Sequence, residues 1–164
     1  MSDFTFAHRK EGFDNHIEKS IRGYSHLMED VISLSRYFIE NNTNVVDIGC
    51  STGKMTKALI DHNMDHCTDA TYIGLEIADG FQKDLIKRAE EVKKYYYNVY
   101  FKKEDARDYN YTNCSLVTSI FTLQFMPKID RESLVKKIYD GLRSGGAYIF
   151  AEKTICENAL VQDM

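Results

Sequence analysis

The chain has 164 residues and a formal net charge of −4 at pH 7, and 43% of its residues are hydrophobic. This length and composition are typical of one globular domain with a sizeable core. They argue against a membrane-spanning protein, because no stretch approaches the roughly 20 apolar residues of a transmembrane helix. The acidic balance gives no sign of the basic face with which proteins bind nucleic acid.

The cysteines and the N-terminus predict a cytoplasmic location. The opening residues MSDFTFAHRK lack the basic and apolar regions of a signal peptide. The four cysteines are widely spaced and form no C-x-x-C pair, which is usual for free thiols in a reducing compartment. They are Cys50, Cys67, Cys114 and Cys156.

Taken in chain order, the predicted helices and strands alternate. The first helix is predicted over 28–40, where apolar residues at helical spacing share one face. That face consists of Val31, Leu34, Phe38 and Ile39. The other helices are predicted over 53–63, 79–94 and 130–142. The strands are predicted over 44–48, 71–77, 99–106, 115–125 and 147–153, the last after a turn at 143–146.

Strands that alternate with helices of this length predict βαβ units and a mostly parallel sheet. We therefore predict a single α/β domain over 1–164, with an N-terminal helical cap at 1–42 and the α/β core at 43–153. The chain ends soon after the fifth strand, whose apolar segment would form an uncovered sheet edge. We expect either a partner subunit to cover that edge, as in a homodimer, or a shortened version of a longer fold.

The glycine loop in NVVDIGCSTGK, residues 44–54, is the main candidate site. Ligands of open α/β sheets bind beyond the carboxyl ends of the strands. Gly49 and Gly53 permit tight turns and a close approach of the backbone to a ligand. Glu76 ends the second strand and could accept both hydroxyls of a ribose, and Asp105, after the third strand, could accept the amine of adenine. Each signal is weak alone, but their order at successive strand ends predicts a ligand site.

Dinucleotides, nucleotide phosphates and S-adenosylmethionine all bind at loops of this kind. The spacing of the glycines and the residues around them distinguish these three ligand classes. The P-loop pattern fails, because the glycine spacing is one residue short and Met55 replaces the Ser or Thr that binds Mg²⁺. The NAD fingerprint G-x-G-x-x-G fails, because Cys50 and Ser51 occupy its middle. Asp47 before the loop gives D-x-G-x-x-x-G, which is the pattern of S-adenosylmethionine sites. We therefore predict S-adenosyl-L-methionine as the ligand.

Three further patterns are interpreted as structural. KKYYYNVYFKK at 93–103 could stack single-stranded nucleic acid, but its aromatic residues equally suit a half-buried strand. DHNMDHC at 61–67 contains possible zinc ligands without a second pair to complete four. Cys50 has no identifiable histidine base, which argues against a nucleophile. We expect no metal site, no direct nucleic-acid partner and no membrane association.

Several stretches outside the glycine loop narrow the interpretation, and two of their segments, SIRGYSH and FTLQF, are much more specific than the loop itself. They are DFTF near the start, FDNHIEKSIRGYSHLM at 13–28, FTLQF at 121–125, KIYDGLRSGGA at 137–147 and AEK at 151–153. Together with DIGCSTG they resemble the carboxy-S-adenosylmethionine synthases over nearly the whole chain. The resemblance implies a Rossmann-like, S-adenosylmethionine-dependent methyltransferase fold, here truncated after the fifth strand. It also implies a transferase that converts S-adenosylmethionine and prephenate into carboxy-S-adenosylmethionine, which a separate enzyme uses to modify the wobble uridine of tRNA.

The resemblance implies a set of ligand contacts and assigns no catalytic residue. These contacts are Tyr24, Gly49, Cys50, Ser51, Glu76, Ile77, Asp105, Ala106 and Ile120. The chain departs from the family at Glu76 and Ile120, where the family usually has Asp and Asn. The family's carboxylate-anchoring arginine lies beyond the fifth strand, and Arg131 and Arg143 lie in the wrong elements to replace it. An ordinary S-adenosylmethionine-dependent methyltransferase and an S-adenosylmethionine-binding remnant without transfer activity therefore stay open as alternatives.

Overall fold

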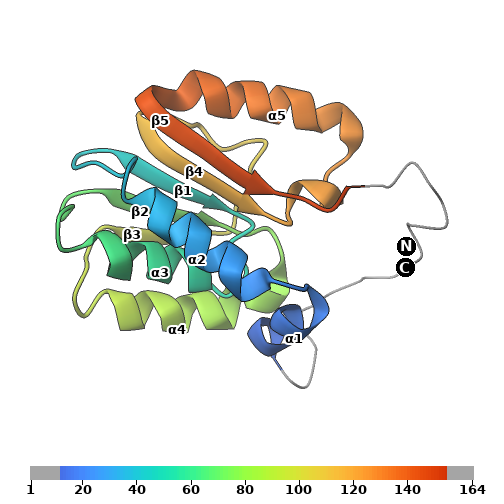
Figure 1. Cartoon of the computed structure of the whole chain (residues 1–164), viewed down its shortest axis with the longest axis horizontal. Helices are drawn as coiled ribbons and strands as arrows, with labels where there is room; N and C mark the ends of the chain where they lie inside the picture. The colour runs from blue at the N-terminus through green and yellow to red at the C-terminus, as the bar shows by residue number, and fades with distance from the viewer. Residues whose placement is uncertain (1–11, 155–164) are drawn as a thin grey trace.

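The chain forms a five-stranded parallel sheet with helices on both faces (Figure 1). The structure is a computed structural model and describes residues 12–154. The strand order is β3-β2-β1-β4-β5, and all four neighbouring pairs are parallel, which confirms the predicted α/β class. The strands are β1 (Asn44–Ile48), β2 (Thr71–Leu75), β3 (Val99–Lys102), β4 (Cys114–Ile120) and β5 (Leu142–Ala151).

Helices α2, α3 and α4 lie on one face of the sheet, and α5 lies on the other (Figure 1). Within residues 12–154, no helix is both long enough and apolar enough to cross a membrane. The helices are α1 (Phe13–Ser20), α2 (Tyr24–Ser35), α3 (Lys54–Asn63), α4 (Gln82–Val92) and α5 (Lys128–Gly141), with short 3-10 turns η2 (Asp79–Phe81) and η3 (Leu123–Phe125).

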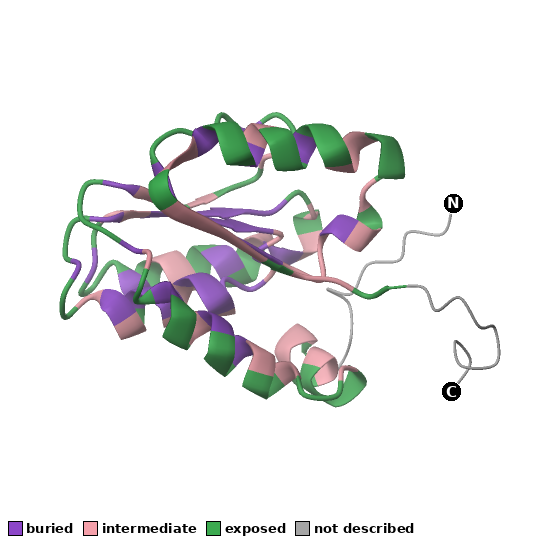
Figure 2. Cartoon of the chain, turned by 45° about the horizontal axis from the view of Figure 1, so that its top comes forward, coloured by how far each residue is buried: buried purple, intermediate pink, exposed green. Residues whose placement is uncertain are grey.

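The central strand β1 and its neighbour β4 are buried almost throughout, because helices cover both faces of the sheet. Val45 and Leu116 belong to the hydrophobic cluster on the side of α2, α3 and α4, whereas Val46 and Val117 belong to the cluster under α5. Figure 2 shows these buried strands between helices whose outer surfaces are exposed. This rigid centre fixes the strand ends at which the site is built.

The structure corrects the predicted first helix. Helix α2 begins at Tyr24 rather than at residue 28, directly after Gly23, whose φ of 77° is left-handed. It ends at Ser35, after which a tighter turn carries the chain to the buried Ile39. Leu34, which lies inside α2, is 45% exposed instead of buried. Helical spacing alone could not show that Ile39 reaches the core from a turn.

Two predicted boundaries beside β4 and β5 are also wrong. The strand predicted over 115–125 ends at Ile120, because Phe121 takes a left-handed φ of 55° and the following residues form η3. The turn predicted at 143–146 lies inside β5, as an irregularity in its pairing with β4. The segment FTLQF is thus a turn at the carboxyl edge of the sheet rather than part of a strand.

Candidate ligand-binding site

The glycine loop joins β1 to α3 at the carboxyl edge of the sheet. Left-handed backbone occurs in it at Gly49 (φ 69°), Ser51 (51°) and Gly53 (73°). The amides of Gly49 and Cys50 both donate to the Leu75 carbonyl, at 2.8 and 3.1 Å, and the Gly53 amide donates to the Cys50 carbonyl at 2.8 Å. Two backbone amides of the loop therefore bind it to the end of β2.

Glu76 completes this connection between the loop and β2. The residue is 6% exposed, and its carboxylate accepts hydrogen bonds from the Ser51 amide at 3.0 Å and the Ala78 amide at 2.8 Å. Burial raises the pKa of this carboxyl, and the two amides partly offset the effect. Each carboxylate oxygen keeps a second lone pair, so Glu76 could still accept hydroxyl donors from a ligand.

Asp47, the acid that precedes the loop, is committed to structural contacts. It is buried, and its carboxylate accepts hydrogen bonds from the Thr56 hydroxyl at 2.7 Å and the Thr118 hydroxyl at 3.0 Å. Burial raises its pKa from 3.8 to about 6, against the opposing effect of the two hydroxyl donors. Because Thr56 lies in α3 and Thr118 in β4, Asp47 ties β1 to both elements.

Gly49 is required by a close contact as well as by its φ. A Cβ at this position would lie 2.4 Å from Oγ1 of Thr122. The Thr122 hydroxyl in turn donates to the Ile48 carbonyl at 3.1 Å. The turn after β4 therefore rests directly on the glycine loop. The motif FTLQF stands out in the sequence, but nothing in it indicates this role of Thr122.

Tyr24 lies beside that turn, at the start of α2. Its ring centroid is 6.4 Å from that of Phe121. Burial raises the pKa of the Tyr24 phenol to about 12, with a further contribution from the nearby Asp14. The hydroxyl is therefore protonated at neutral pH and able to donate a hydrogen bond. Its predicted contact with the ligand stays a prediction.

Helix α1 lies within the predicted N-terminal helical cap, although no separate helix was delimited there, and it is bound to the glycine loop. The Thr52 hydroxyl donates to the Asp14 carboxylate at 2.8 Å, and Lys54 forms an ion pair with Glu18 at 2.7 Å. Short and without buried residues, α1 gives little sequence signal. These contacts hold the N-terminal segment against the start of α3.

The other predicted contacts differ in their surroundings. Ile77 is 59% exposed, whereas Ala106 is buried. Asp105 forms an ion pair with Arg107 at 2.6 Å, and the hydrogen bonds from this guanidinium lower the pKa of the carboxyl. Ile120 is the last residue of β4. The structure thus brings Ser51 and Glu76 into direct contact but gives Asp105 a partner of its own.

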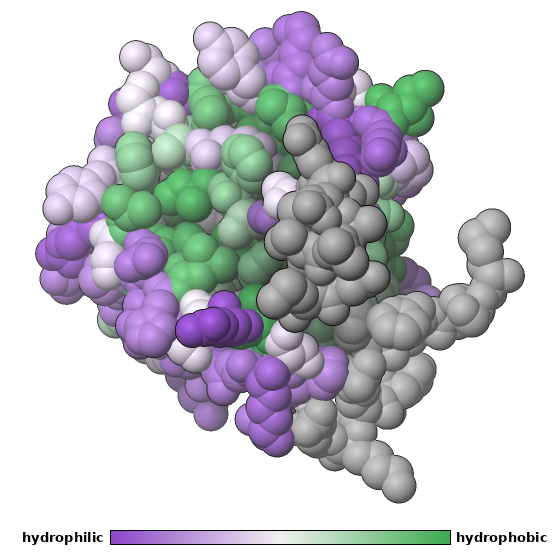
Figure 3. All heavy atoms as spheres, turned by 45° about the vertical axis from the view of Figure 1, so that its right-hand side comes forward, coloured by the Kyte–Doolittle hydropathy of each residue, from purple (hydrophilic) through white to green (hydrophobic). Residues whose placement is uncertain are grey.

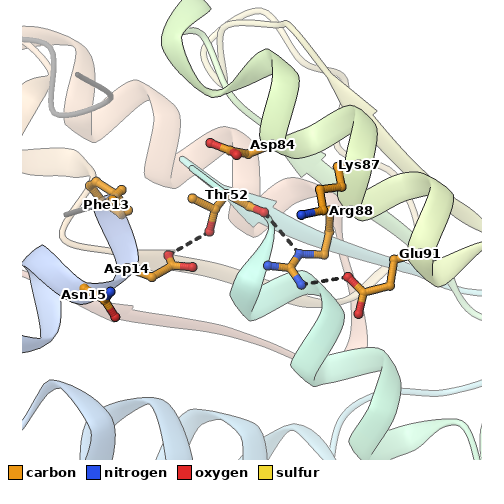
Figure 4. A pocket seen from close by; sticks show the side chains of 9 residues that line it. Phe13, Asp14, Asn15, Thr52, Asp84, Lys87, Arg88 and Glu91 are labelled. Atoms are coloured by element: carbon orange, nitrogen blue, oxygen red, sulfur yellow. Dashed lines mark hydrogen bonds and ion pairs between the residues drawn. The ribbon is translucent and has the colours of Figure 1, made fainter. Parts of the chain in front are cut away.

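A cavity of about 370 Å³ opens between α1, α4 and Thr52 of the glycine loop (Figure 4). Arg88 crosses it, donating to the Thr52 carbonyl at 3.3 Å and pairing with Glu91 at 3.0 Å. Asp14 and Lys87 also line it, but none of the nine predicted contact residues does. This cavity is therefore separate from the site at the strand ends.

The side chains considered as alternatives have structural contacts. Within residues 12–154, no group of three or more His, Cys, Asp or Glu side chains gathers in a metal-binding arrangement. Asp65 pairs instead with Arg36 and His66. Burial raises the pKa of the Cys50 thiol well above its usual value, which disfavours a thiolate. In the stretch 93–103, Tyr96 is buried, and its hydroxyl donates to the Ala70 carbonyl.

Neither arginine considered as a carboxylate anchor is free. Arg131 donates to the carbonyls of Gln124 and Met126, at 3.2 and 2.9 Å. Arg143 forms an ion pair with Glu40.

Glu152 is the residue of this region that the sequence analysis missed. It follows β5, and its carboxylate accepts hydrogen bonds from three successive amides, those of Thr122 at 3.0 Å, Leu123 at 2.7 Å and Gln124 at 3.1 Å. The only signal in the sequence was its place in the AEK motif. The turn after β4 is thereby bound to the end of β5.

The side of the molecule toward which the strands point carries an apolar surface. The strand arrows in Figure 1 point to the side that Figure 3 brings toward the viewer, and hydrophobic residues gather there in a broad area bordered by hydrophilic ones. Among the described residues, Phe125 of η3 is 64% exposed and Ile129 of α5 is 86% exposed.

Comparison with known proteins places the chain among methyltransferase-fold proteins. A model of the family described as "Methyltransferase domain" matches residues 45–146. Carboxy-S-adenosyl-L-methionine synthase of Staphylococcus epidermidis is 37% identical over 141 residues, which cover 86% of this chain and 58% of that protein. The enzyme of the same name from Aliivibrio salmonicida is 34% identical over 169 residues, which cover 100% of this chain and 67% of that protein.

A solved structure shows the same fold at low sequence identity. The N-methyltransferase NodS of Bradyrhizobium japonicum, in complex with S-adenosyl-L-homocysteine, matches with a TM-score of 0.68 at 12% identity. The match covers 88% of this chain and 67% of that one. The Rossmann-like methyltransferase fold that the sequence predicted is thus confirmed.

Proposed function

Since the chain belongs to the carboxy-S-adenosyl-L-methionine synthase family and contains a methyltransferase domain over residues 45–146, we propose that it binds S-adenosylmethionine at the carboxyl ends of β1 and β2. We propose further that the reaction is the one its relatives are named for, the formation of carboxy-S-adenosylmethionine. The proposed carboxyl donor is prephenate, and the proposed use of the product is the modification of tRNA. The chain spans 58% of the length of the first relative and 67% of the second.

One observation carries the proposal: the backbone amides of the glycine loop already donate their hydrogen bonds to groups within the protein. The amides of Gly49, Cys50 and Ser51 are all used within the protein, the first two by Leu75 and the third by Glu76. A loop that cradled a phosphate would need such amides free for the anion. The geometry therefore favours a ligand without phosphates, while the Glu76 carboxylate supports recognition of a ribose. S-adenosylmethionine has both properties.

Carboxyl transfer to the methyl carbon also requires a cation for the new carboxylate. Arg131 and Arg143 are both engaged elsewhere, so we do not assign either of them this role. Because both arginines already bind other groups of the protein, a second candidate function is favoured, in which the chain binds S-adenosylmethionine without transferring a group. The two candidates differ in their products and agree on the cofactor.

Calorimetry with S-adenosylmethionine tests the cofactor. Glu76→Ala removes the proposed ribose acceptor together with a hydrogen bond to Ser51. We expect the affinity of this variant for S-adenosylmethionine to fall at least about ten-fold. Glu40→Ala is the control, because it removes the same carboxylate group from a position beside Arg143, away from the proposed site. Absence of binding heat from the unmodified chain would refute the assignment.

Mass spectrometry after incubation with S-adenosylmethionine and prephenate then separates the candidates. The synthase replaces a methyl hydrogen of the cofactor with a carboxyl group, so the product is heavier by the mass of one CO2. A binding protein leaves the cofactor unchanged.

We also propose a homodimer and a cytoplasmic location. Strand β5 is an edge of the sheet, and its Phe150 is 58% exposed, a combination that native proteins usually cover. Light scattering should find a dimer, and a monomer at high concentration would contradict the proposal. The described cysteines Cys50, Cys67 and Cys114 are free thiols, which supports a reducing compartment.

A further inference from the structure

The turn at 121–126 carries two side chains that border the proposed cofactor site. Phe121 lies 6.4 Å from Tyr24 between ring centroids, and Thr122 packs against Gly49 of the glycine loop. The turn is strained at its first residue, because Phe121 has a φ of 55°. Bulky residues rarely adopt this left-handed conformation, because it brings Cβ too close to the backbone. Other contacts must therefore stabilise this conformation of the turn.

Two charged side chains hold it through hydrogen bonds to its backbone. The Glu152 carboxylate accepts hydrogen bonds from the amides of 122–124, at 2.7 to 3.1 Å. The Arg131 guanidinium donates to the carbonyls of Gln124 and Met126, at 2.9 to 3.2 Å. Glu152 thus binds backbone amides of the turn, and Arg131 binds its backbone carbonyls. Hydrogen bonds to ionised groups are stronger than those between neutral groups.

We propose that Glu152 is a positioning residue for the cofactor site: it holds the strained turn in the conformation that sets Phe121 against Tyr24 and Thr122 against the glycine loop. The proposal rests on the proposed function, because it assumes that S-adenosylmethionine binds beside this turn. Glu152 acts through the backbone of the turn. Nothing in its contacts requires it to touch the cofactor.

The substitution Glu152→Gln tests the inference with little change in shape. The glutamine oxygen can still accept from Thr122 and Leu123, but its amide group then faces the Gln124 amide, donor against donor. We expect affinity for S-adenosylmethionine, measured by calorimetry, to fall about ten-fold. We expect Glu152→Asp, which keeps the charge, to recover part of that loss. Glu40→Gln is the control and should change affinity less than about two-fold.

Hydrogen exchange at residues 122–124 supplies a second readout that a general loss of stability would not reproduce. In Glu152→Gln these amides should exchange faster, while those of β4 keep their protection. Unchanged affinity together with unchanged exchange in a folded Glu152→Gln variant would overturn the inference. Equal losses of protection at 122–124 and throughout β4 would also overturn it, because they indicate general destabilisation. If the unmodified chain does not bind S-adenosylmethionine, the proposed function fails first.

Discussion

Replacement of Asp47 by Asn should make the stability of the protein less dependent on pH. The folded protein raises the pKa of this buried carboxyl from 3.8 to about 6. In the unfolded chain the group ionises near its ordinary pKa. Above about pH 4 the unfolded chain therefore carries this negative charge, whereas the folded protein still favours the protonated carboxyl. Stability therefore falls as the pH rises from about 4 to about 6, and the full cost is present above that range.

The shift from 3.8 to about 6 corresponds to about 3 kcal/mol, at about 1.4 kcal/mol per pKa unit. Asn cannot ionise, yet its amide can still bond both neighbouring threonine hydroxyls, which can donate or accept. We therefore expect the free energy of unfolding of Asp47→Asn, relative to the unmodified protein, to rise by up to about 3 kcal/mol between pH 4 and pH 7.

Urea unfolding followed by circular dichroism at several pH values measures this difference. The other buried acid, Glu76, is present in both proteins, so its titration largely cancels in the comparison. A stability difference that stays constant from pH 4 to pH 8 would refute the reasoning.

Three further substitutions test packing by the same urea assay. Gly141→Ala should destabilise by about 1–3 kcal/mol despite its gain in helix propensity, because the new Cβ would lie 2.4 Å from Cβ of Tyr111. Asn63→Ala should cost about 1–3 kcal/mol, because it removes a buried hydrogen bond of 2.8 Å to the Ser35 hydroxyl, which joins α3 to α2. Lys136→Ala should change stability by less than about 0.5 kcal/mol, because its ion pair is exposed. A large loss for Lys136→Ala, or none for the other two, would contradict these estimates.

The sequence predicted the sheet and the glycine loop well because both have local signals. The run NVVDI matches β1 at both ends, and the glycines of the loop stand where left-handed backbone is required. Glu76 was identified from its place after a strand, and the structure sets it against the loop.

What the sequence could not predict depends on contacts between distant segments. FTLQF has the apolar character of a strand, and only the structure shows that Phe121 leaves the ladder and that Glu152 binds the amides that follow. The pattern around Asp47 suggested an acid at a ligand, whereas Thr56 and Thr118 occupy its carboxylate. Residue type and spacing reveal that a polar group is present, but only the tertiary structure decides which partner it has.

The central position of β1 has a consequence for the order in which the chain folds. On one edge Asn44 pairs with Thr71, but on the other edge it pairs with Cys114, more than twice as far along the chain. The second pairing closes a longer loop and costs more entropy, and such non-local contacts slow folding. During synthesis, the middle strand therefore keeps one unpaired edge until β4 has left the ribosome. We expect chains that stall before β4 to aggregate through that edge.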